Sequence, residues 1–245
     1  MTNTIIECKN CSTHFKGNFC FNCGQKADKE RFTHKNILKE FMHGFYHVNG
    51  GFLFTLKELF VHPGNMLRGY IIGRRVSYMN PFTYLVLIGL VGGFIYARTG
   101  IIEHVDEMFL ASGNTIRFTR EHFSYRILLM IPTYAIVCSI IFRSFKYNLA
   151  EHLIITTFLV SQSIVFLIVW MIIFSSLIEN DTLFRFLYSS AFISVIIYQV
   201  VVMFAIFNAG NNVLRWLRAF IAVMFGLGLS FIFIHFLVKL IDIIT

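Results

Sequence analysis

Four cysteines near the N-terminus form the group of residues whose spacing most clearly predicts chemistry. They are arranged as two C-x-x-C pairs, Cys8 with Cys11 and Cys20 with Cys23. Each pair places two thiolates on one tight turn, which is half of a tetrahedral metal site, and two pairs complete it. Gly24 follows the second pair and can adopt the left-handed backbone that such a turn requires. We therefore predict a zinc knuckle that holds one structural Zn²⁺ ion.

Two alternatives compete with structural zinc. Disulfides need an oxidising compartment, whereas the charge pattern described below places this end of the chain in the reducing cytoplasm. Iron binding or redox use of the thiolates stays open, because four-sulfur sites also hold iron. Four protein ligands leave no open position at the metal, so no catalytic residue is predicted there. The fifth cysteine, Cys138, is expected to be a small apolar residue inside a helix.

A second candidate site is the basic pair Arg74 and Arg75, directly before the first long apolar run. Such a pair anchors the topology, and guanidinium groups also bind phosphate through two parallel hydrogen bonds. We predict that Arg74 and Arg75 bind lipid headgroups or an anionic partner. His43 and His47 have the i, i+4 spacing of a metal site but lack the glutamate of an H-E-x-x-H motif. No phosphate-binding loop or nucleophile motif is present, so we predict that the protein is not an enzyme.

The composition of the chain is that of an integral membrane protein. Of its 245 residues, 56% are hydrophobic and 14% are charged, whereas soluble domains carry about 25% charged residues. The charges lie mainly before residue 76 and in short gaps between long apolar runs, as in proteins with bilayer-spanning helices. The formal net charge is +8. Because the basic residues flank apolar runs, they favour contact with anionic lipid over contact with nucleic acid.

The chain divides into a zinc knuckle at residues 1–30, an amphipathic juxtamembrane region at 31–75 and a transmembrane domain at 76–245. In the middle zone, helical periodicity runs from Thr33 to Tyr46 and again from Phe52 to Phe60. Pro63 and Gly64 then end the pattern. Neither piece is suited to crossing a bilayer. We expect both to lie in the membrane interface, on the cytoplasmic ends of the spanning helices, or against the knuckle.

Five apolar segments in the last zone are predicted to span the membrane. Their bounds are Val76 to Ala97, Ile127 to Phe142, Leu153 to Ile178, Phe186 to Phe207, and Ala219 to Val238. Basic residues gather before the first segment and in alternate gaps, which predicts a cytoplasmic N-terminus and an extracytoplasmic C-terminus. The predicted fold class is an all-α polytopic membrane protein with about five transmembrane helices, preceded by a cytoplasmic four-cysteine zinc knuckle and amphipathic helices.

Small and polar residues inside these segments predict how the helices pack. Small residues four positions apart allow close approach, within one chain or between two copies. They are Gly89 with Gly93, and Ala222 with Gly226 and Ser230. Gln162, Ser194 and Gln199 are expected to form hydrogen bonds between helices, with a polar transport path as the alternative. No acidic residue is expected deep in a span, which disfavours a proton-coupled or cation-coupled transporter.

The first third of the chain resembles a family of Bacteroidota membrane proteins of unknown function that carry an N-terminal zinc ribbon. The resemblance rests on Cys8 to Gln25, Gly51-Phe52, Thr55 to Leu59, Pro63-Gly64, Tyr70 to Arg75, Tyr78 and Asn80 to Leu85. It implies a bacterial inner-membrane protein and supplies no catalytic residues. The predicted topology is also similar to that of Yip1-type membrane proteins, which is an analogy of architecture alone.

These observations favour a non-enzymatic interaction or assembly factor of the inner membrane, with the knuckle as its cytoplasmic docking surface. Membrane lipids and a cytoplasmic protein are the expected partners, homo-oligomerisation is compatible with the small-residue faces, and nucleic acid is not expected. The alternative is a small oligomeric channel or transporter that uses the polar residues of the third and fourth spans.

Overall fold

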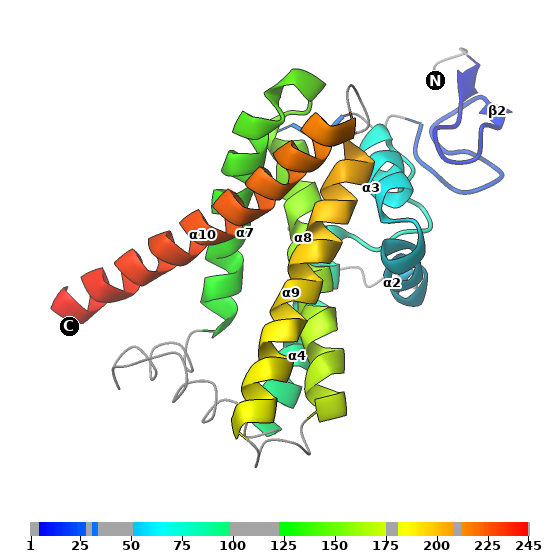
Figure 1. Cartoon of the computed structure of the whole chain (residues 1–245). Helices are drawn as coiled ribbons and strands as arrows, with labels where there is room; N and C mark the ends of the chain where they lie inside the picture. The colour runs from blue at the N-terminus through cyan, green and yellow to red at the C-terminus, as the bar shows by residue number, and fades with distance from the viewer. Residues whose placement is uncertain are drawn as a thin grey trace.

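The computed structural model describes residues 5–27, 31–33, 51–98, 123–174, 181–207 and 212–244. This part of the chain is mostly helical, and Figure 1 shows the N-terminal strands beside one end of a helical bundle. The elements are β1 (Ile6–Glu7), β2 (His14–Phe15), α2 (Phe52–Val61), α3 (Pro63–Ile72), α4 (Pro81–Arg98), α7 (Phe123–Ile141), the 3-10 turn η1 (Arg143–Phe145), α8 (Leu149–Phe174), α9 (Asp181–Ile206) and α10 (Asn212–Ile244). The helix predicted from Thr33 to Tyr46 lies outside the described residues, apart from Thr33 itself.

Three of these helices, α8, α9 and α10, are long and apolar enough to cross a membrane. The apolar stretches of α4 and α7 are shorter, at Pro81–Ile95 and Ile127–Ile141. The predicted count of about five spans is therefore not supported by helix length in the described part of the chain. The first predicted span began at Val76, but Asn80 caps the helix: its side-chain oxygen accepts a hydrogen bond from the amide of Phe82 at 2.9 Å.

The central helix of the bundle is α8. Nearly every side chain from Ala150 to Val165 is buried, as expected for a helix that is apolar on all sides. It contacts α4, α7 and α9, while α10 packs across α7 and α9 (Figure 1). Packing around one buried helix thus holds the bundle together.

Buried polar side chains connect four helices at one level of the bundle. The Tyr84 hydroxyl in α4 donates to Oε1 of Gln162 in α8 at 2.8 Å. The Tyr134 hydroxyl in α7 donates to Oε1 of Gln199 in α9 at 2.9 Å, and Nε2 of Gln199 donates to the hydroxyl of Ser163 in α8 at 2.8 Å. We call these five residues the polar girdle. The predicted hydrogen bonds between helices at Gln162 and Gln199 are confirmed.

The small-residue face of α10 packs against α7 as predicted. Ser230 lies with its hydroxyl 2.7 Å from that of Thr133, and Gly226 faces the Tyr134 ring. A Cβ atom added at Gly226 would lie 2.2 Å from Cδ2 of Tyr134. Only glycine therefore allows α10 to approach α7 this closely.

The glycines of α4 behave differently from the prediction. At Gly89 and Gly93, no atom of the described residues lies within 4 Å of an added Cβ, so these glycines make no close packing contact with that part of the chain. Instead Gly92 packs against α8, where an added Cβ would lie 3.0 Å from Cγ2 of Ile164. The prediction of close packing at Gly89 and Gly93 is therefore wrong for contacts within the described part of the chain, where Gly92 faces α8 instead.

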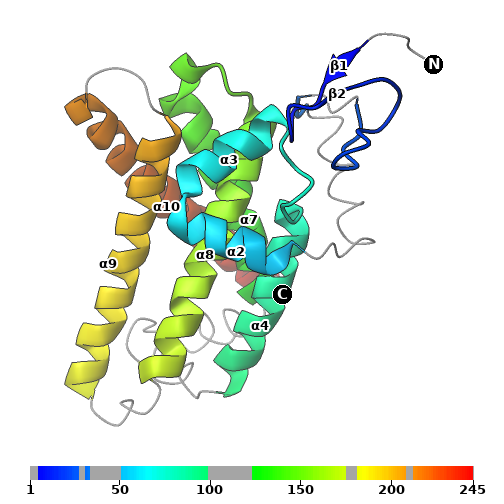
Figure 2. The ribbon, with the colours of Figure 1, turned by 90° about the vertical axis from the view of Figure 1, so that its right-hand side faces the viewer.

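The helices α2 and α3 form a hairpin on the side of the bundle. Figure 2 shows both crossing α8 rather than covering its end. The Tyr198 hydroxyl in α9 donates to the backbone oxygen of Leu59 at 2.8 Å. At the corner, an added Cβ on Gly64 would lie 2.6 Å from Cβ of Ala205 in α9. The Pro63-Gly64 turn thus brings the hairpin backbone into direct contact with α9.

Candidate metal centre and its attachment to the bundle

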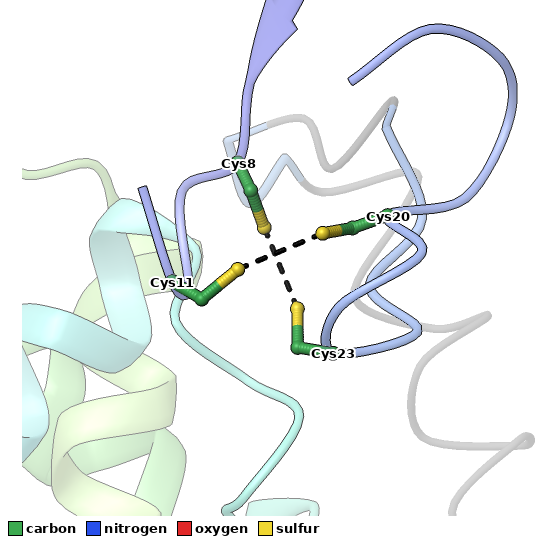
Figure 3. A group of neighbouring side chains, drawn as sticks. All are labelled: Cys8, Cys11, Cys20 and Cys23. Carbon is green, nitrogen blue, oxygen red and sulfur yellow. Dashed lines mark hydrogen bonds between the residues drawn. The ribbon is translucent and has the colours of Figure 1, made fainter. Parts of the chain in front are cut away.

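The four N-terminal cysteines converge on one point, as Figure 3 shows. Their sulfur atoms all lie within 4.8 Å of one another. The Sγ atoms of Cys8 and Cys23 are 3.5 Å apart and those of Cys11 and Cys20 are 3.6 Å apart. A tetrahedral zinc site with Zn–S bonds of about 2.3 Å has sulfur atoms about 3.8 Å apart. All four cysteines are free, so the group has the size and chemistry of a metal site and contains no disulfide.

The two cysteine turns have the same backbone geometry. The amide of Ser12 donates to the carbonyl of Cys8 at 2.8 Å, and the amide of Gly24 donates to the carbonyl of Cys20 at 2.8 Å. Ser12 has φ 57° and Gly24 has φ 73°. The left-handed conformation predicted at Gly24 is confirmed, and Ser12 occupies the equivalent position in the first turn. The knuckle is therefore a structural repeat, visible in the sequence as C-x-N-C occurring twice with an offset of twelve residues.

A small sheet and a buried ring support these turns. Strands β1 and β2 are antiparallel, with Ile6 opposite Phe15, and an isolated bridge joins Phe19 to Lys26 behind the second turn. The Phe15 ring is buried beside Cys8 and Cys20. The cluster is small, which is why such modules depend on a metal for most of their stability.

Thr13 links the two turns and tunes one thiol. Its hydroxyl oxygen lies 3.3 Å from Sγ of Cys11 and accepts a hydrogen bond from the Asn22 side chain at 3.2 Å. The hydrogen bond with Thr13 lowers the pKa of Cys11 to about 6, which favours the metal-binding thiolate. Desolvation raises the pKa of Cys23 to about 12. Metal binding must therefore release a proton from Cys23.

The first cysteine turn touches the end of α3. Gly73 follows α3 with φ 124°, and an added Cβ would lie 3.0 Å from Cδ of Lys9. Lys9 stands between Cys8 and Cys11 in the sequence. The metal centre and the bundle are thus in direct contact at this glycine.

A stronger attachment follows the knuckle at Arg31, which pairs with Glu151 in the first turn of α8. The Arg31 guanidinium donates to Oε2 of Glu151 at 2.8 Å, to Oε1 as well, and to the backbone oxygen of Lys146. Glu151 is fully buried. It also forms a capping box with Asn148: the Asn148 amide donates to Oε2, and the Glu151 amide donates to Oδ1 of Asn148, both at 2.9 Å.

Phe32 completes this attachment. Its buried ring stacks on Tyr70 with centroids 5.9 Å apart, and the Arg75 guanidinium carbon lies 3.6 Å from the centroid of the Phe32 ring. Asn148 donates to the Phe32 backbone oxygen at 2.7 Å. We call Arg31 and Phe32 the anchor. Arg74 and Arg75 were predicted to bind lipid or a partner. Arg75 packs on Phe32 of the anchor, whereas Arg74 is exposed. Binding of a ligand by either arginine stays a prediction.

Neither the anchor nor its binding site at Asn148 and Glu151 was predicted from the sequence. The Asn148-to-Glu151 capping box could have been found, because it directly precedes an apolar run. The adjacent His152 is also fully buried, and within the described residues neither ring nitrogen has a hydrogen-bond partner. Among the residues that the structure describes, the four cysteines form the only cluster of potential metal ligands. His43 and His47 lie outside those residues.

Part of the chain is similar to a known protein family. Residues 49–92 match a family described as "Protein of unknown function (DUF3667)". The matched segment contains α2, α3 and the first two thirds of α4, and it does not include the cysteines. The resemblance to a family of unknown function is thus supported for this segment. No curated protein and no solved structure matches the chain.

Proposed function

We propose that the protein is a non-enzymatic interaction or assembly factor of the bacterial inner membrane, whose zinc-loaded knuckle docks a protein partner on the cytoplasmic face. The observation that carries the proposal is the closed four-sulfur group beside exposed aromatic rings. Four thiolates leave no coordination position for a substrate, so the metal would serve to shape the two turns. Phe19 and Phe21 flank Cys20 and are 63% and 79% exposed, which suits a protein contact.

Zinc is the proposed metal because it prefers tetrahedral four-sulfur sites and is redox-inert in the reducing cytoplasm. The exposed Arg74 is proposed to contact lipid phosphate or an acidic segment of the partner, with Arg75 supporting it from the anchor. This combination gives the surface two recognition elements, one aromatic and one basic.

We also propose five crossings, with the N-terminus inside and the C-terminus outside. Consecutive helices from α4 to α10 run in alternating directions (Figure 1). The polar girdle places α4 and α7 at the same level as α8 and α9. Short helices that share this level with long ones can cross where the bilayer thins locally.

A channel or transporter remains the competing function. Most polar groups of its candidate residues are already engaged: Oε1 of Gln162 and both polar atoms of Gln199 bond within the polar girdle, and the Ser194 hydroxyl donates to the backbone oxygen of Ala191 at 2.7 Å. Nε2 of Gln162 is buried without a hydrogen-bond partner among the described residues. Polar groups paired in this way favour helix packing over conduction.

The test is co-purification from mild detergent, with metal analysis, of the wild type and three variants. Phe21→Ser should lose the partner and keep the zinc, Cys20→Ser should lose both, and Lys16→Gln, an exposed control on the same knuckle, should lose neither. Recovery of the same partner with Phe21→Ser would contradict the docking proposal. Solute flux in proteoliposomes that persists in Cys20→Ser but fails in Gln162→Leu would favour the transporter.

A further inference from the structure

The position of α2 along the bundle carries an inference about the membrane. Besides the Leu59 contact with Tyr198, the Phe60 ring lies 5.2 Å from that of Phe166 in α8. The Phe52 ring lies 5.6 Å from that of Tyr84 in α4. These contacts place α2 beside the polar girdle, well away from the start of α8. At 1.5 Å per residue, Phe166 is about 25 Å from Leu149 along the helix.

Helix lengths then decide whether α2 lies outside the bilayer. Beyond the contacts with α2, α8 has about 8 residues left in the described chain, α4 has about 14 and α9 about 17. These correspond to about 12, 21 and 26 Å, whereas a bilayer core is about 30 Å thick. If α2 lay above the bilayer, the described helix left in α8 and α4 would be shorter than a bilayer core, and α9 would keep about 17 residues, the lower limit for a span. These lengths favour a membrane that extends past α2 toward the start of α8.

The outward face of α2 fits such an environment. Its exposed residues follow the i, i+1, i+4, i+7, i+8 pattern of one helical face. They are Leu53, Phe54, Lys57, Phe60 and Val61, four of them apolar. The opposite face buries Thr55 and Leu59 against the bundle. The inward face is apolar as well, with Leu59 buried and Phe52 and Leu56 packed against the core. A helix that is apolar on both faces suits a bundle surface covered by lipid better than one covered by water.

We infer that the α2–α3 hairpin is a re-entrant element in the cytoplasmic half of the bilayer, with the outward face of α2 against lipid acyl chains. The hairpin keeps its backbone hydrogen bonds through the corner, where the amide of His62 donates to Glu58 and that of Met66 donates to His62, both at 2.9 Å. Such pairing is required in hydrocarbon. Lys57 places its aliphatic stem along this face and extends its ammonium toward the headgroups.

Cysteine labelling in lipid nanodiscs tests this inference, because both membrane faces are accessible there. Leu53→Cys should react with a water-soluble maleimide at least about tenfold more slowly than Lys16→Cys, since a thiol in hydrocarbon does not form the reactive thiolate. Peptide mass spectrometry separates these sites from the native cysteines. Both should react equally after denaturation in SDS. Equal rates in nanodiscs would place α2 in water and overturn the inference.

A photo-crosslinker identifies what covers the face. With p-benzoylphenylalanine at position 60, we expect adducts with phosphatidylethanolamine or phosphatidylglycerol in nanodiscs that contain these lipids. The same residue at position 21 on the knuckle serves as the water-exposed control and should give no lipid adduct. A crosslink from position 60 to a second copy of the chain, in place of lipid, would overturn the inference and make this face an oligomer interface.

Discussion

Gly226→Ala in α10 is the sharpest test of how α10 packs on α7. The new Cβ would lie 2.2 Å from Cδ2 and 2.5 Å from Cε2 of Tyr134, a fully buried ring whose hydroxyl bonds Gln199. Gly228 is two residues away in the same helix, and within the described residues nothing lies within 4 Å of its Cβ position. The two alanine variants therefore make the same chemical change and differ only in the space available.

The expected magnitude follows from that overlap. Carbon atoms in contact prefer about 3.5–4.0 Å, so the Gly226→Ala methyl overlaps the Tyr134 ring by more than about 1 Å. Overpacking of this kind costs about 1–3 kcal/mol. Displacing Tyr134 also weakens its hydrogen bond, worth about 1 kcal/mol. Alanine also favours the helix over glycine by about 1 kcal/mol, which offsets part of this loss. The net loss of stability for Gly226→Ala is then about 1–3 kcal/mol, and Gly228→Ala should be neutral or slightly stabilising.

Thermal unfolding of the purified proteins in one detergent, followed by tryptophan fluorescence, measures the difference. At about 2–4 °C per kcal/mol for a chain of this size, the Gly226→Ala midpoint should fall by about 2–12 °C. The Gly228→Ala midpoint should match or exceed that of the wild type. If both variants shift the midpoint equally, the close approach of α10 to Tyr134 is wrong.

Three further predictions concern the metal centre and the anchor. Cys20→Ser should abolish stoichiometric zinc and expose the knuckle to protease while membrane insertion of the helices persists; zinc retained by this variant would contradict the four-cysteine site. Because the pKa of Cys23 is raised to about 12, its thiol is protonated near neutral pH and must lose that proton to bind metal. Zinc affinity in chelator competition should therefore rise with pH, by about tenfold per unit for each proton released. Arg31→Ala leaves the buried Glu151 without its partner and should lower the free energy of unfolding by about 1–2 kcal/mol. This loss is at the low end for a charged pair because the Arg31 side chain is half exposed to solvent. The Arg31→Ala, Glu151→Gln double variant should lose less than the sum of the two single losses, and strict additivity would refute the pairing.

The geometry of the metal centre was largely readable from the sequence because it is local. Two C-x-x-C pairs fix the ligands, and Gly24 marks the left-handed residue that ends the second turn. Ser12 performs the same task in the first turn but was not predicted, since left-handed conformations are uncommon for residues other than glycine. The exposure of Phe21 also depends on the folded turn, because its neighbours Cys20 and Phe15 are buried.

Helix positions were predicted more accurately than helix ends and contact faces. The third span was predicted to begin at Leu153, but the capping box of Asn148 and Glu151 starts α8 at Leu149. Hydropathy also does not distinguish one face of an apolar helix from another, so Gly92 of α4 was overlooked. The pairing of Arg31 with a residue 120 positions away leaves no trace in one sequence.

The 120 residues between Arg31 and Glu151 determine which parts of the protein are synthesised first. The four cysteines lie within sixteen residues, so the knuckle can take up metal as soon as it leaves the ribosome. At that time Glu151, the residue of α8 that binds Arg31, has not yet been synthesised. At about 5–20 residues per second, Glu151 is added about 6–24 s after Arg31. The N-terminal module can therefore fold before α8 exists, and the Arg31 attachment can form only after the start of α8 has been synthesised.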